Sequence, residues 1–272
     1  MSGPFFVPAD LANICLTAYQ PRLYAVRYRP VLHSVPATEP VSAGRDELWG
    51  SMSFESVQRA GLGGASGTFT ALVAADGSAG HRYLNRLSQG IAPMRDLSDM
   101  VHLICILHAR HPDIIELAAN HSKADATSAW LAAAKSGFGE ERDFIVRLVA
   151  ATGPLPSTPG QAQSEACVAA QRHALDMLAQ SGRTGCADGT ALALALDWSG
   201  IRALLDMTAD RLGIESPPTH LPPAHETATV IDALATTLPI ERAMLFGAQQ
   251  MLAQHRGLWD LLEARASARG AG

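Results

Sequence analysis

Apolar residues recur along most of the chain at the spacing of an α-helix rather than that of a strand. In residues 96–110, Leu97, Val101 and Ile104 lie three or four positions apart, which places them on one face of a helix. Three other long segments have the same pattern, namely 161–180, 190–212 and 239–268. The pattern predicts an all-α protein.

Glycine and proline divide this pattern into separate helices. The segments 61–64, 153–160 and 214–223 are rich in these residues, which end helices or form turns. The positions of such residues predict a bundle of nine to eleven helices. We place shorter helices at 66–75, 81–89, 125–136 and 140–151, and one running to residue 120 with Pro112 in its first turn.

Prolines are spread differently over the N-terminal part of the chain. Residues 1–44 contain six of them, at positions 4, 8, 21, 30, 36 and 40. This spacing leaves no room for a long helix. We therefore predict an extended, irregular arm over residues 1–44, followed by a single α-helical bundle domain over residues 45–272.

Composition and charge narrow the class of protein further. Apolar residues make up 47% of the chain and charged residues 17%, and the net charge is −5. Without clustered lysine and arginine we expect no nucleic-acid partner, and no apolar run is long enough to cross a membrane. The N-terminus does not resemble a signal peptide, and the four cysteines lack close pairs. We expect reduced thiols and a soluble protein of the bacterial cytoplasm.

A run of metal-ligating residue types occurs in residues 102–111. His102, Cys105, His108 and His111 recur every three positions, but a helix turns about 100° per residue, so His102 and His108 end about 120° apart. One ion cannot collect all four side chains, and no metal site is predicted. Asp99 and His102 fall on the polar side of the helix, where we expect a local surface pair, whereas His108 falls on the apolar face.

Other long helices also carry polar residues on or near their apolar faces. These are Gln171, Asp197 and His255, and Glu241 has nearly the same azimuth as His255. A buried polar group without a hydrogen bond costs about 1–3 kcal/mol, so such residues are expected to find partners. The candidate ligand-binding residues are therefore His108, Gln171, Asp197, Glu241 and His255; no catalytic residue and no cofactor can be named.

Two functional hypotheses follow from these features. The first is a non-catalytic helical protein that binds a partner protein or its own copy through an alanine- and leucine-rich helix face. The alternative is an enzyme, or a small-molecule or metal binder, that uses a polar pocket inside the bundle. The competing structural explanation is that each interior polar residue separately satisfies a backbone carbonyl, a neighbouring side chain or an internal water.

Overall fold

The computed structural model describes residues 63–122 and 125–270. In these residues the chain forms nine α-helices and one 3-10 turn, and it forms no strand there. The prediction of an all-α protein is confirmed. The arm predicted for residues 1–44 lies outside the described residues.

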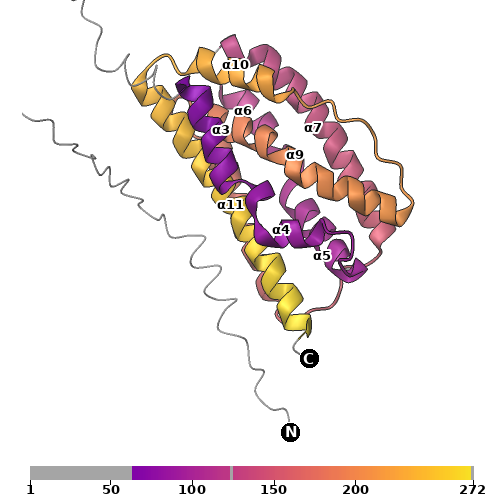
Figure 1. The fold of residues 1–272 in the computed structure, drawn as a ribbon. Helices are drawn as coiled ribbons and strands as arrows, with labels where there is room; N and C mark the ends of the chain where they lie inside the picture. Colours follow the sequence, from indigo (N-terminus) through magenta and orange to yellow (C-terminus); the bar gives the residue numbers. More distant parts are fainter. Residues whose placement is uncertain (1–62, 123–124, 271–272) are drawn as a thin grey trace, which may run out of the picture.

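The helices pack around one central helix, α9, which contacts most of the others. Figure 1 shows α11 running along one side of the bundle, with α3 and α4 beside it and α7 and α10 toward the other side. The elements in chain order are α3 (Gly64–Asp76), the 3-10 turn η1 (Ser78–Gly80), α4 (Arg82–Leu87), α5 (Met94–His108), α6 (Ile114–His121), α7 (Asp125–Thr152), α8 (Gln161–Ala179), α9 (Cys186–Leu212), α10 (Ala224–Leu234) and α11 (Leu238–Gly270).

The helices α9 and α11 approach each other closely at two glycines. A Cβ on Gly189 of α9 would overlap the backbone of Met244, and a Cβ on Gly247 of α11 would overlap the carbonyl oxygen of Cys186. Any larger residue at either position forces the two backbones apart. This close contact holds α11 against α9, the two helices that carry His255 and Asp197.

One predicted helix break is wrong. Residues 125–136 and 140–151 were expected to form two helices, but α7 is continuous from Asp125 to Thr152. Gly137 lies where a Cβ would overlap the backbone of His220 and Leu221. This glycine therefore allows the 214–223 loop to approach α7, and a single glycine inside a long helix costs only about 1 kcal/mol.

The predicted start of α6 is also wrong. Pro112 was expected in the first turn, but Asp113 is the N-cap and the helix begins at Ile114. Asp113 accepts a hydrogen bond from the backbone N–H of Glu116, whose side chain in turn accepts one from the backbone N–H of Asp113. This capping box satisfies two backbone donors at once and sets the N-cap at Asp113, one residue beyond the proline.

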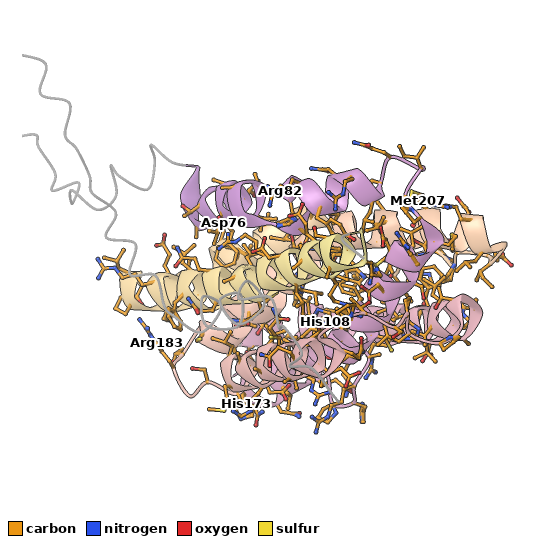
Figure 2. The ribbon with its side chains drawn as sticks, turned by 90° about the horizontal axis from the view of Figure 1, so that it is seen from below. Asp76, Arg82, His108, His173, Arg183 and Met207 are labelled. Carbon is orange, nitrogen blue, oxygen red and sulfur yellow. The ribbon has the colours of Figure 1, made fainter. Side chains whose placement is uncertain are left out.

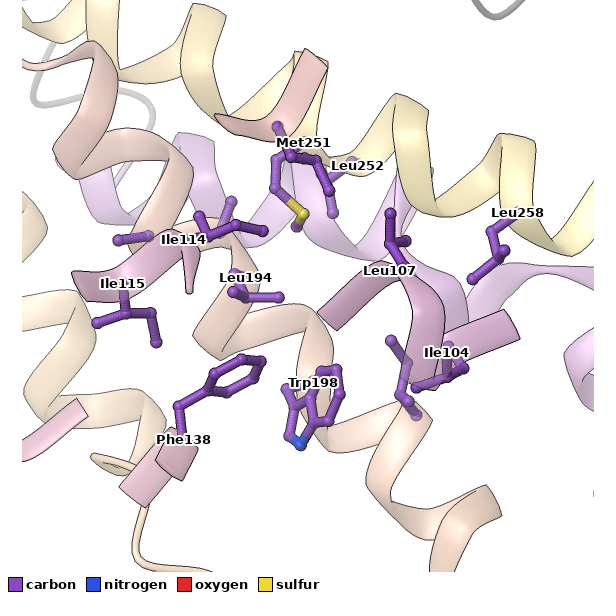
Figure 3. Close-up of a cluster of buried hydrophobic side chains, with 14 of the residues drawn as sticks. Ile104, Leu107, Ile114, Ile115, Phe138, Leu194, Trp198, Met251, Leu252 and Leu258 are labelled. Carbon is purple, nitrogen blue, oxygen red and sulfur yellow. The ribbon is translucent and has the colours of Figure 1, made fainter. Parts of the chain in front are cut away.

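The hydrophobic core lies where α5, α6, α7, α9 and α11 meet. Figure 3 shows Phe138 of α7 close to Trp198 of α9, with Leu107 of α5 and Met251 of α11 around them. All four side chains are buried. The core therefore joins segments far apart in the sequence around the last turn of α5.

Two further predictions concern the membrane and the cysteines. No helix in the described residues is long and apolar enough to cross a membrane. Cys105 and Cys186 are free thiols, whereas Cys167 is disulfide-bonded. The prediction that all four cysteines are reduced is therefore wrong.

Candidate functional site

Two buried histidines meet at the centre of the bundle. His108 is the last residue of α5 and His255 lies in the middle of α11; their Nε2 atoms are 2.8 Å apart. Their exposed fractions are only 2% and 1%. Figure 2 shows His108 between the helices, whereas His173 lies at the edge of the molecule.

A carboxylate orients the second of these rings. Nδ1 of His255 donates a hydrogen bond to Oδ2 of Asp197 on α9, at 2.6 Å. Asp197 is itself 3% exposed. The hydrogen bond fixes the position of the His255 proton on Nδ1 and directs Nε2 toward His108.

The turn η1 supplies the remaining partners of this carboxylate. The backbone N–H of Ser78 donates to Oδ1 of Asp197 at 2.6 Å, and its hydroxyl donates to Oδ2 at 2.5 Å. The indole N–H of Trp259 donates to the Ser78 hydroxyl at 2.9 Å. We call the connected residues Trp259, Ser78, Asp197, His255 and His108 the interior polar chain.

Close packing of η1 against α9 brings Ser78 to the Asp197 carboxylate. Gly77 directly precedes Ser78, and a Cβ on Gly77 would overlap both the carbonyl oxygen of Val73 and Oδ1 of Asp197. Only glycine permits this approach. On the other side of the turn, a Cβ on Gly200 of α9 would press against Ala79, so η1 rests directly on α9.

Hydrogen bonds and burial set the protonation of Asp197 and His108, two members of the interior polar chain, near neutral pH. Burial alone would raise the pKa of Asp197, but the hydrogen bonds from His255 and Ser78 outweigh burial and lower it. Burial, and secondarily the neighbouring His255, lowers the pKa of His108 well below that of an exposed histidine. With one proton on each ring, and that of His255 on Nδ1 beside Asp197, Nε2–H of His108 donates to Nε2 of His255.

One end of the interior polar chain, Nδ1 of His108, is an open end without a hydrogen-bond partner among the described residues. This nitrogen carries a lone pair and is buried. The rings of Phe138 and Trp198 stand edge-on to His108, with centroids 6.1 and 5.4 Å away. The indole N–H of Trp198 is already donated to Oε2 of Glu141 at 3.1 Å. Apart from His255, the rings that pack against His108 are therefore those of two aromatic side chains.

Of the five residues predicted as candidates, the structure brings three together and leaves two apart. His108, Asp197 and His255 form one hydrogen-bonded chain. Glu241 has the azimuth of His255 but lies fourteen residues earlier on α11, which is about 21 Å along the axis. Gln171 is buried on α8, and its Oε1 has no hydrogen-bond partner among the described residues.

The predicted surface pair of Asp99 and His102 is wrong. Asp99 is fully buried and accepts hydrogen bonds from Arg265 and Arg269 of α11. His102 is half-buried and donates from Nε2 to the carbonyl oxygen of Gly153 at 2.8 Å. The two side chains lie near each other on α5 but bond to different parts of the fold.

Sequence reasoning missed Ser78, Trp259, Phe138 and Trp198. Trp198 directly follows the candidate residue Asp197, and this proximity in the sequence was the available signal. Trp259 follows His255 by four positions, so it lies one turn away on the same face. Ser78 gave no signal, because it lies in a short turn without periodicity.

Fold and site together define an all-α bundle with a buried carboxylate–imidazole–imidazole chain. The chain belongs to a family of unknown function (DUF6975), whose model matches residues 73–270. That range contains every residue of the interior polar chain. No curated protein and no solved structure matches the sequence. In the part of the chain that the structure describes, no three side chains of His, Cys, Asp or Glu are grouped to hold a metal ion.

We expect the His108→Gln variant to lose part of the pH dependence of stability. Because the pKa of folded His108 is lowered, the unfolded chain binds more protons at this residue once the pH falls below about 6.5. His108 alone then lowers the free energy of unfolding of the wild type by about 1.4 kcal/mol in total between pH 7.5 and 5.5. Urea unfolding at pH 7.5, 6.5 and 5.5 measures the slope of stability against pH, and His108→Gln should reduce the total decrease by that amount.

The matched control is His102→Gln on the same helix, which should keep the wild-type slope. The lowered pKa of Asp197 acts in a separate window, because its stabilising effect is lost only as the pH falls toward the acidic range of carboxyl groups. Equal slopes for wild type and His108→Gln between pH 7.5 and 5.5 contradict the neutral state assigned to His108.

Proposed function

We propose that the protein binds a small molecule inside the helical bundle, held by a hydrogen bond to Nδ1 of His108. The observation that carries this proposal is the open end of the interior polar chain: a buried imidazole nitrogen with a lone pair and no partner among the described residues. The ligand that fits has an apolar body and one hydroxyl-type donor, because the surrounding side chains are aromatic and aliphatic.

The neighbours of His108 do not supply the missing donor. The other three ring nitrogens of the histidine pair are already in hydrogen bonds, and the Trp198 indole donates to Glu141. Glu141 in turn is fixed by Nη1 of Arg202, at 2.5 Å. A buried acceptor without a donor costs about 1–3 kcal/mol, so a ligand that donates to Nδ1 gains that free energy on binding.

The other predictions about function stay predictions. Met177 of α8 and Phe246 of α11 are exposed apolar side chains, as an interaction with a partner protein or a second copy requires, but neither belongs to the interior polar chain. The expected bacterial and cytoplasmic origin likewise stays a prediction. Small-molecule binding is preferred because it accounts for the open nitrogen of His108, which an external protein surface does not.

Phenol is the probe that tests this proposal, and anisole is its matched control ligand. We expect isothermal titration calorimetry to show phenol binding to the wild type, and binding of anisole, which lacks the O–H donor, to be weaker by at least about fivefold, the ratio for 1 kcal/mol. In the His108→Phe variant, which has no acceptor, phenol and anisole should bind alike.

The control protein is His173→Phe, which replaces an exposed histidine on α8 and should keep the preference for phenol. If neither ligand binds the wild type, a bound water alone satisfies His108 and the proposal is wrong. If His108→Phe keeps the wild-type preference for phenol, the ligand binds elsewhere. Nitrogen NMR of ¹⁵N-histidine-labelled wild type checks the contact directly, since phenol should shift the Nδ1 signal of His108.

A further inference from the structure

We infer that the interior polar chain is a proton relay, and that the ligand class is a weakly acidic hydroxyl compound, such as a phenol, that is bound as its anion. This inference rests on the proposed function, because it assigns what happens to the ligand hydroxyl once it lies against His108. It goes further in naming where the proton of that hydroxyl comes to rest.

The geometry defines one path for the proton. The ligand O–H transfers its proton to Nδ1 of His108, and the proton on Nε2 of His108 moves 2.8 Å to Nε2 of His255. The ligand O–H bond and one N–H bond break, and two N–H bonds form. The products are the ligand oxyanion, a neutral His108 with its proton on Nδ1, and a His255 cation that keeps its Nδ1–H bond to Asp197.

Hydrogen bonding is preserved at every position after the transfer. Nδ1–H of His108 now donates to the oxyanion, which is a charge-assisted and therefore stronger bond than the one before. Nε2–H of His255 donates to Nε2 of His108, the reverse of the original direction. The total charge of the site is unchanged, because the proton stays inside it.

The charges around the chain explain why the proton comes to rest on His255. His255 lies 2.6 Å from the Asp197 carboxylate, whereas His108 has Phe138 of α7 and Trp198 of α9 as its other ring neighbours. On the other side of Asp197, the hydroxyl of Ser78 donates to the carboxylate and accepts from the indole of Trp259, and both of these residues are uncharged. The indole of Trp198 donates to Glu141, whose charge is paired with Arg202. An imidazolium is therefore stabilised at His255 and not at His108.

Asp197 is built to remain the counter-charge throughout the transfer. It accepts three hydrogen bonds, from the backbone of Ser78, the hydroxyl of Ser78 and the ring of His255. Hydrogen bonds to a carboxylate favour its ionised form, and the pKa of Asp197 is lowered accordingly. The donors bind both carboxylate oxygens, and a neutral amide, which presents one oxygen and one NH2 group, could not accept all three bonds.

4-Nitrophenol tests the relay, because its anion is yellow and its neutral form is not. The probe is titrated with wild-type protein at a pH where it is mostly un-ionised in water, and the absorbance of the bound fraction reports its ionisation. We expect the bound probe to be mostly the anion. In Asp197→Asn, which keeps an acceptor but removes the charge, the anion-to-neutral ratio of the bound probe should fall at least about tenfold. Asp210→Asn, an exposed aspartate on the same helix, should behave as wild type.

The possible outcomes separate the proton relay from the ligand-binding site on which it rests. If 4-nitrophenol binds the wild type but stays un-ionised, the relay is wrong and the binding site stands. If neither 4-nitrophenol nor phenol binds, both are wrong. If Asp197→Asn does not fold, ¹⁵N-histidine NMR of the wild type decides, because the relay requires both nitrogens of His255 to become protonated on binding, and an unchanged His255 overturns it.

Discussion

Replacing Asp197 with alanine is expected to lower the free energy of unfolding by about 3–5 kcal/mol, the range found when one partner of a buried polar or ionic pair is removed. The substitution leaves three buried donors without an acceptor: the Ser78 N–H, the Ser78 hydroxyl and Nδ1–H of His255. It also opens a space between η1 and α9. Urea unfolding followed by circular dichroism at pH 7.5 measures the loss.

Two variants show that the effect belongs to this carboxylate. Asp197→Asn keeps an acceptor oxygen and should lose less stability than Asp197→Ala. Asp210→Ala removes an exposed aspartate from the same helix and should change stability by no more than about 0.5 kcal/mol. A loss below about 1 kcal/mol for Asp197→Ala, the size of an average substitution, contradicts the role given to Asp197.

Helical periodicity was sufficient to predict the fold class and the inward faces of the long helices. His108, Asp197 and His255 were placed on or near apolar faces from their azimuth alone, and all three are buried. Azimuth is a local property of one helix, which is why it can be read without a structure. The capping box of α6 is equally local, and giving Asp113 and Glu116 precedence over Pro112 predicts the observed helix start.

What could not be predicted is the position of each residue along its helix relative to the other helices. Glu241 and His255 share an azimuth, but about 21 Å of helix separates them, and only the packing of α11 on α9 selects His255. Gly137 shows the same limit, since its role is set by the loop that crosses α7. Ser78 reaches Asp197 across 119 positions of sequence, a pairing that no local pattern encodes.

The error at Asp99 has a different cause, and it could have been avoided. On α5, Asp99 precedes the buried Leu103 by one turn, and on α11, Arg265 follows the buried Leu258 and Leu262 at helical spacing. Two opposite charges on two inward faces predict a buried ion pair. Asp99 was predicted at the surface because α5 was considered alone. The arginines that neutralise Asp99 lie on another helix.

Replacing Asp99 with alanine is expected to lower the free energy of unfolding by about 3–5 kcal/mol, because the charge of Arg265 is then buried without its partner. Both side chains are fully buried. Nε and Nη2 of Arg265 bind the two carboxylate oxygens at 2.8 and 2.7 Å, and Nη1 of Arg269 binds Oδ2 at 2.7 Å. The C-terminal part of α11 is held to α5 by these bonds. Urea unfolding at pH 7.5 measures the loss.

The double variant Asp99→Ala/Arg265→Met separates an ion pair from simple packing. If the uncompensated charge causes the loss, removing Arg265 as well should restore part of the stability, because burying two apolar groups is often no worse than burying the pair. Asp143→Ala, an exposed aspartate on α7, should stay within about 0.5 kcal/mol of wild type. A double variant less stable than Asp99→Ala shows instead that Arg265 stabilises the fold through its contacts with Gln161 and Thr158, independently of Asp99.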